Sequence, residues 1–222
     1  MIHVYAFAAD VDELPELEGV DGAPVERLLV DEVTTVFSRR TESSGDERLR
    51  EDALAHGAVV DALMDAASVV IPVRFGEALP DAAELGETVR GRLPELRRSF
   101  ERVRGCVELG VRVWGADEES DDSAGAATGT AYMRRRAAVE AERRDAAEGL
   151  HRQLDAIARA AVVGAPAPFG RERFSAAYLV SSERLEDVRA AVERFGAEHA
   201  DLTVLCTGPW APYSFGEEEP PA

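Results

Sequence analysis

The stretch CVELGVRVW, residues 106–114, decides the fold of the second half of this 222-residue chain. Its apolar side chains recur at every second position, at Val107, Leu109, Val111 and Val113. This period predicts a strand with one buried face. The pattern that follows predicts a helix, a strand, a helix and a strand at about 130–162, 173–181, 182–199 and 201–207, with room for a short extra strand near 161–165. Strands that alternate with helices in this order favour a ferredoxin-like sandwich, in which two helices cover one face of an antiparallel sheet.

The first half of the chain predicts an α+β arrangement of its own. Strands are expected at 2–9, at 25–40 as a hairpin or two short strands, and at 68–76, and helices at about 46–67 and 80–104. Pro72 should place its strand at a sheet edge or end its ladder, and Pro94 should kink or split the second helix.

We therefore expect an α+β fold of two domains. The first is an N-terminal α+β domain at 1–104, and the second a C-terminal ferredoxin-like domain at 105–222. The second domain should carry an acidic loop at 115–129, a long charged helix and an aromatic tail at 208–215.

The charge of the chain bears on its partners. Its 43 acidic residues face only 25 basic ones, all of them arginine, so the formal net charge is −18. Such a negative field repels nucleic acid phosphates and anionic lipid headgroups, and we expect neither nucleic acid nor a membrane as a partner. The sequence also shows no apolar run long enough to span a membrane and no signal peptide, so a cytoplasmic location is expected.

Motifs for catalysis or metal binding are missing from the sequence. The four histidines, His3, His56, His151 and His199, have no second histidine or cysteine at ligand spacing, so each is interpreted as a lone surface or helix residue. There is no nucleophile elbow, and a chain without lysine has no Walker lysine. We therefore predict no metal, no cofactor and no enzymatic activity.

Four short motifs are not explained by composition or periodicity: PVRFG at 72–76, GTAYMRRR at 129–136, AAYLV at 176–180 and GPWAPYSF at 208–215. In order and spacing they resemble the gas vesicle protein F/L family over nearly the whole chain. PVRFG and the terminal GPW-P-Y-F pattern are the most specific parts. Ala211 departs from the family, which often carries another proline at that position.

The resemblance implies a protein that is required for building gas vesicles, the gas-filled buoyancy organelles of some bacteria and archaea. Members of the family are accessory or minor components, none is known as an enzyme, and they associate with a small, very hydrophobic shell protein. A location at the gas vesicle, contacts with other accessory proteins and two α+β domains are implied as well. Such a helper needs an apolar patch to hold the shell protein and a charged exterior to keep the complex soluble.

Seven residues are candidates for partner binding or for locking the domains together: Arg74, Phe75, Tyr132, Trp210, Pro212, Tyr213 and Phe215. We expect Phe75 to fill the gap between the domains and Arg74 to form a salt bridge with an acid of the other half. The alternative for both is a contact with the shell protein.

The tail aromatics also have two interpretations. The first is that the tail folds back on the protein with Trp210 buried, which leaves at most Tyr213 or Phe215 for a partner. The second is that these aromatics form an exposed hot spot for the shell protein. For the whole chain, the alternatives to a gas vesicle role are a cytosolic ferredoxin-like regulatory or ligand-binding module and an unrecognised hydrolase. A deep pocket with convergent polar groups would favour either alternative.

Overall fold

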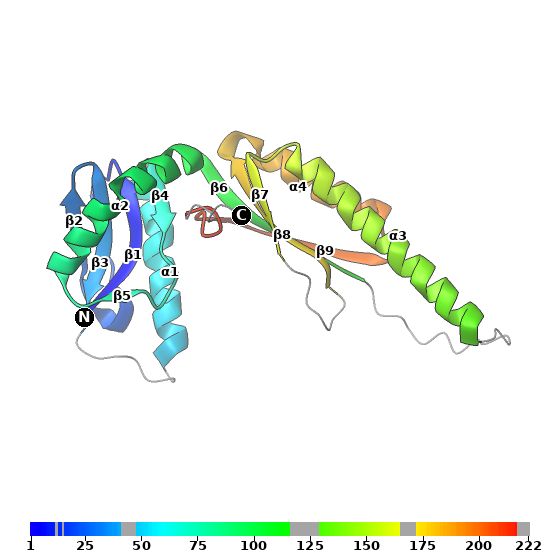
Figure 1. Ribbon diagram of the computed structural model, residues 1–222, viewed down its shortest axis with the longest axis horizontal. Coiled ribbons are helices and arrows are strands. Elements are labelled where there is room, and N and C mark those ends of the chain that lie inside the picture. The colour runs from blue at the N-terminus through cyan, green and yellow to red at the C-terminus, as the bar shows by residue number, and fades with distance from the viewer. Residues whose placement is uncertain (12, 15, 41–47, 116–128, 165–171, 217–222) are drawn as a thin grey trace. The chain divides into compact units, whose positions relative to one another are not determined.

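The computed structural model of the chain describes residues 1–11, 13–14, 16–40, 48–115, 129–164 and 172–216 (Figure 1). It is an α+β protein that divides into two compact units. The first unit is Met1–Val107 together with the C-terminal segment from Trp210 onward, and the second is Glu108–Pro209. The sequence placed the whole tail in the C-terminal domain. That assignment is wrong from Trp210 onward, because Ala211 belongs to the core of the first unit.

A five-stranded antiparallel sheet forms the first unit, with the order β2-β3-β1-β4 and with β5 also paired to β1. Its strands are β1 (Ile2–Ala9), β2 (Val25–Val30), β3 (Val33–Arg39), β4 (Val69–Pro72) and β5 (Ala78–Leu79). All eight residues of β1 are buried, as its continuous apolar run predicts. The predicted hairpin is confirmed by the pairing of β2 with β3. Pro72 is the last residue of the edge strand β4, and one further backbone bond to β1 follows it, from the Val73 amide to the Tyr5 carbonyl at 2.8 Å.

Two helices contact this sheet, α1 (Leu49–Ala66) and α2 (Ala82–Val103). The Asp81 side chain caps α2 by accepting hydrogen bonds from the Ala83 and Glu84 backbone amides. Contrary to one of the two expectations for it, Pro94 does not split this helix. Its ring lies on the exposed side, while the opposite side is fixed by buried residues that include Leu85, Val89, Leu96 and Phe100.

The second unit contains a four-stranded sheet with the order β7-β8-β6-β9. Its elements are β6 (Cys106–Gly115), α3 (Gly129–Asp155), β7 (Ala160–Val163), β8 (Glu172–Ser181), α4 (Leu185–Glu198) and β9 (Leu202–Trp210). Its core lies between the helices and one face of the sheet, with Leu109 and Val111 of β6, Leu150 of α3 and Phe195 of α4 among its buried members.

The long charged helix α3 ends at Asp155, earlier than the predicted 162, because the residues that follow pair with β8 as the strand β7. Among the described residues, none of the helices is both long and apolar enough to cross a membrane. The predicted acidic loop lies mostly at 116–128, outside the described residues.

Candidate functional site

The tail segment, residues 210–215, packs against the first unit. Ala211 and Phe215 are 1% and 4% exposed, and Pro212 is buried as well. Tyr213 is half-buried and packs against the core cluster that contains Ala211. The segment after Trp210 is therefore part of the first unit's packing rather than a solvated end.

Contacts from β4 and α2 hold the tail segment in place. The guanidinium of Arg102, in the last turn of α2, donates a hydrogen bond to the Phe215 carbonyl. Within the segment, the Phe215 amide donates to the Pro212 carbonyl at 3.1 Å. The chain then passes so close to β4 that a Cβ on Gly216 would lie 2.8 Å from Ile71 Cγ2.

Trp210 departs from the expected arrangement. It was expected to be buried, but 48% of it is exposed, so that expectation is wrong. The reason is its position, since it is the last residue of β9, where the chain leaves the second sheet, and the tail segment begins to bury its side chains only at Ala211. Trp210 is thus an exposed aromatic residue directly before a buried segment of the chain.

The remaining predicted site residues are Arg74, Phe75 and Tyr132, of which Phe75 packs against the same core cluster of the first unit as Tyr213. The ring of Phe75 is half-buried and lies 5.6 Å from that of His3, within the first unit. Arg74 is exposed and has no ion-pair partner among the described residues of its own unit, so the expected salt bridge with the other half stays a prediction. The Tyr132 side chain lies outside the described part of the structure.

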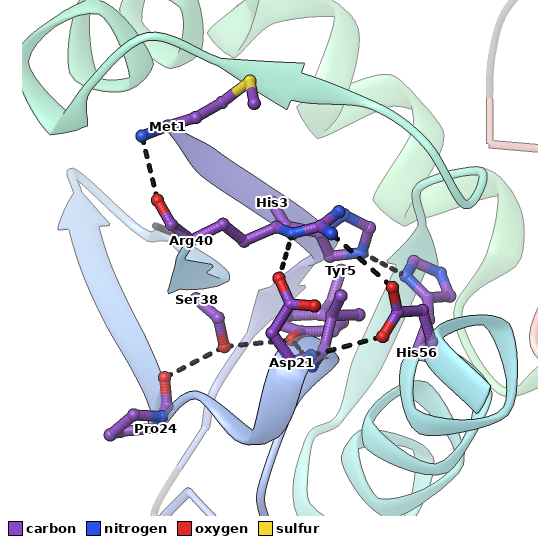
Figure 2. Close-up of polar contacts among 10 residues, drawn as sticks. Met1, His3, Tyr5, Asp21, Pro24, Ser38, Arg40 and His56 are labelled. Carbon is purple, nitrogen blue, oxygen red and sulfur yellow. Dashed lines mark hydrogen bonds and ion pairs between the residues drawn. The ribbon is translucent and has the colours of Figure 1, made fainter. Parts of the chain in front are cut away.

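A polar cluster inside the first unit was missed by the sequence (Figure 2). His3 of β1 and His56 of α1 are buried and joined by a hydrogen bond of 2.9 Å between Nε2 and Nδ1, which makes the interpretation of these two as lone residues wrong. A signal for this was present, because His3 lies in the buried strand and His56 lies on the apolar stripe of its helix. When the apolar faces of a strand and a helix pack together, polar residues on those faces are brought into contact.

Hydrogen-bond partners fix the proton positions of this pair. The His56 Nε2 atom lies 3.0 Å from the Val73 carbonyl, which can only accept, so Nε2 carries the proton. Neutral His56 then accepts at Nδ1 from the Nε2 proton of His3. The His3 Nδ1 atom is left as a buried acceptor without a partner among the described residues. Protonation there would create a buried, unpaired donor.

Electrostatics keep both rings neutral. Burial, followed by the nearby His56 and Arg40, lowers the pKa of His3 from 6.5 to about 4, against smaller opposing effects of Asp52 and Asp21. Burial also lowers the pKa of His56, and its hydrogen bond to the Val73 carbonyl opposes this only in part.

An ion-pair group of Arg40, Asp21 and Asp52 lies beside the two histidine rings. The Arg40 guanidinium contacts Asp21 at 2.7 Å and Asp52 at 3.5 Å, and all three side chains are largely buried. The Asp21 amide also donates to Asp52 Oδ1 at 3.3 Å. Figure 2 shows the Arg40 carbonyl accepting from the terminal amine of Met1, so the group ties the N-terminus to β3 and α1.

Tyr5 organises the other side of the cluster. Its hydroxyl accepts from the Val20 amide at 2.7 Å and donates to Ser38 Oγ at 2.9 Å, and Ser38 in turn donates to the Pro24 carbonyl at 2.9 Å. Gly19 lies so close that a Cβ there would overlap the Tyr5 hydroxyl and lie 2.6 Å from Ser38 Oγ.

The chemistry available to the cluster is limited by these bonds. Within the described ranges, no three histidine, cysteine, aspartate or glutamate side chains are grouped so that they could hold a metal ion. The histidine and tyrosine protons are engaged in internal hydrogen bonds. The cluster is therefore suited to fixing the fold of the first unit, whereas Arg74 and Trp210 are predicted site residues that are exposed.

Comparison with solved structures places the fold. The structure superposes on the gas vesicle protein GvpF from Anabaena sp. PCC7120 with a TM-score of 0.75 at 20% identity, covering 98% of this chain and 96% of that one. The corresponding values for GvpF from Microcystis aeruginosa are 0.74, 18%, 98% and 99%. The chain thus has the fold of these two proteins.

Comparison of sequences identifies the family. Gas vesicle protein L of Streptomyces sp. is 30% identical to this chain, with 96% of this chain and 91% of that protein covered. Gas vesicle protein F2 of Halobacterium salinarum is 28% identical, with the same coverage. The family model described as gas vesicle synthesis protein GvpL/GvpF matches residues 1–217. The chain belongs to the GvpL/GvpF family of gas vesicle synthesis proteins, and its role is related to gas vesicles.

Proposed function

We propose that this protein is a non-catalytic assembly or minor structural protein of gas vesicles, which binds the hydrophobic shell protein and is needed for vesicle formation. Membership of the GvpL/GvpF family supports the cellular process. The protein acts at the gas vesicle and in the surrounding cytoplasm, needs no cofactor, and meets other gas vesicle accessory proteins there.

The observation that carries the binding step is the exposure of Trp210. Its side chain is 48% exposed, whereas Ala211, the next residue, is 1% exposed. An aromatic side chain on a fixed backbone binds apolar surface with little loss of conformational freedom, which is why tryptophan is enriched among binding hot spots. Trp210 therefore makes the contact with the shell protein, while Pro212 and Phe215 lock the tail and thereby position it.

The charge of the chain supports the same role. A shell protein that is exposed before assembly presents apolar surface that aggregates. A carrier with a net charge of −18 keeps its complexes apart by repulsion.

For the second unit we propose the ferredoxin-like sandwich. Its strand order, β7-β8-β6-β9, with α3 and α4 over one face, supports this assignment. The long charged helix α3 then provides a second contact surface, which is used with other proteins of the assembly.

The experiment is disruption of the gene in a vesicle-forming host, followed by complementation. The host without the gene should form no vesicles, the wild-type gene should restore them, and Trp210→Ala should not. Leu205→Ala is the matched control, because Leu205 lies on the same strand and is 47% exposed, and it should restore vesicles. Normal vesicles in the disrupted host, with no paralogue present, would overturn the proposal.

A further inference from the structure

The N-terminal third of α3 lies outside the packing of its own unit. Every side chain that the structure describes from Thr130 to Ala138 is exposed, and burial begins only at Val139. Figure 1 shows this end of α3 extending past the strands of its sheet. A helical segment without tertiary contacts is marginally stable in water, so it gains from a partner.

One face of α3 stays exposed along most of its length and changes charge along the way. We call it the outer face; its members are Arg134, Ala137, Ala138, Ala141, Asp145 and Glu148. These positions share one side of a 3.6-residue helix, opposite the buried Ala147, Leu150 and Leu154. The outer face is positive at Arg134, apolar and small in its middle and negative at Asp145 and Glu148, and the exposed Arg152 makes it positive again in the last turn.

Such a face is complementary to a second copy of itself. We propose that two copies of this protein pair through the outer faces of their α3 helices, antiparallel and related by a twofold axis. If Ala138 of one copy meets Ala141 of the other, Arg134 of each copy lies against Asp145 of its partner, and two equivalent ion pairs form. The alanines at the crossing let the two helices approach closely.

Contacts among the described residues of one copy do not satisfy these charges. Arg134 and Asp145 are eleven residues apart on the same helix, roughly 16 Å along its axis, so they cannot reach one another. Within the described parts of the chain, neither side chain has an ion-pair partner. The first turn of α3 also contains no acid, and a cation near a helix N-terminus opposes the macrodipole. The partner's Asp145 supplies the missing negative charge.

The size of the interface sets its strength. Four turns of helix bury much less than the roughly 1,200 Å² of a standard interface, so the dimer is weak and reversible. The net charge of −18 on each copy opposes pairing, and roughly physiological salt, about 0.15 M, screens this repulsion.

Sedimentation equilibrium of the full chain at increasing concentration tests the proposal. The wild type should dimerise, and Arg134→Glu and Asp145→Arg should each weaken the dimer about tenfold or more, because each turns two attractions into repulsions. An equimolar mixture of these two variants should dimerise again. In the mixed dimer the glutamate introduced in one copy faces the arginine introduced in the other, and the second contact keeps its original arginine and aspartate.

Arg152→Glu is the matched control for these variants. It makes the same charge change as Arg134→Glu on an exposed residue of the same helix, beyond the overlap of the two copies. It should leave dimerisation unchanged.

Three results would overturn the proposal. A wild type that stays monomeric up to about 1 mM shows that the outer face does not pair copies. Equal dimerisation of wild type and both variants assigns the dimer to another surface. A mixture that remains monomeric although each variant keeps the wild-type helix content by circular dichroism assigns Arg134 to a different partner.

Discussion

Single residues in the first unit show how its buried polar groups are arranged. The His3–His56 hydrogen bond needs an unprotonated Nδ1 on His56, and a proton on His3 Nδ1 would be a buried donor without a partner among the described residues. The Arg40 guanidinium nearby adds to the cost of a proton on His3. A buried network of this kind gives the fold a unique arrangement when it is satisfied, and it destabilises the fold when one member gains a charge.

The pH dependence of stability follows from His3. Its pKa is about 4 in the folded protein and 6.5 in the unfolded chain, so between these values the unfolded chain binds more protons. The stabilisation is therefore complete above pH 6.5 and is lost as the pH falls toward 4. We predict that His3 alone lowers the free energy of unfolding by about 2 kcal/mol between pH 7.5 and pH 5, measured by urea unfolding.

Two variants check this assignment. His3→Gln should be less stable than the wild type at pH 7.5 but should lose about 2 kcal/mol less on going to pH 5. His199→Gln, in the second unit, should retain the wild-type loss. The same pH dependence in His3→Gln and wild type would assign the acid sensitivity to other groups.

Replacing either of two glycines of the first unit by alanine should change the stability of the protein, in opposite directions. Gly19→Ala forces the new Cβ into the Tyr5 hydroxyl and Ser38 and should destabilise the protein by about 1–3 kcal/mol. Gly57→Ala adds its methyl to open space inside helix α1 and should stabilise by about 0.5–1 kcal/mol. Thermal unfolding of both variants is the measurement, and a neutral Gly19→Ala would show that the Tyr5 hydroxyl is not held in this position.

At the scale of the elements, periodicity predicted most strands and helices, and its errors have physical causes. The alternation in 106–114 and the continuous apolar run of 2–9 each fix a strand, because the side-chain pattern itself records burial. The end of α3 was misplaced because residues 160–163 are small and apolar and suit a helix or a strand equally, and only pairing with β8 decides between them. Pro94 was overinterpreted, because the sequence does not reveal that its ring lies on the exposed side of a helix held by its other face.

The composition of the tail segment marked it as a site of interest, but it did not reveal which of its side chains are buried. Which of its aromatics is buried depends on β4 and on Arg102, which lie more than a hundred residues earlier in the chain. For His3 and His56 the sequence indicated that each side chain is buried, but not that the two meet, since 53 residues separate them.

The two ends of the tail segment should respond differently to truncation. Phe215→Ala removes a side chain that is 4% exposed and should lower the free energy of unfolding by about 3 kcal/mol. Trp210→Ala removes one that is 48% exposed and should change it by less than about 1 kcal/mol. Urea unfolding of both variants measures the difference. Equal losses would mean that Trp210 is part of the packing and is not held ready for a partner.

At the scale of the whole molecule, family membership indicates the cellular process, and the surface of the protein supports the proposed binding of the shell protein. The match of residues 1–217 to the GvpL/GvpF family places the chain among gas vesicle proteins. Its charge of −18 and the exposed Trp210 support the proposed role of a carrier that contacts the shell protein. Composition revealed the first of these features, whereas the exposure of Trp210 required the structure.

Co-expression with the shell protein tests the central claim most directly. The soluble fraction of the shell protein, and the amount that co-purifies with this chain, should rise with the wild type and with Leu205→Ala, and should fall strongly with Trp210→Ala. All three proteins should unfold at similar urea concentrations, so that any loss reflects binding. Equal recovery of soluble shell protein with wild type and Trp210→Ala would contradict the role of Trp210, and no recovery with the wild type would contradict shell protein binding itself.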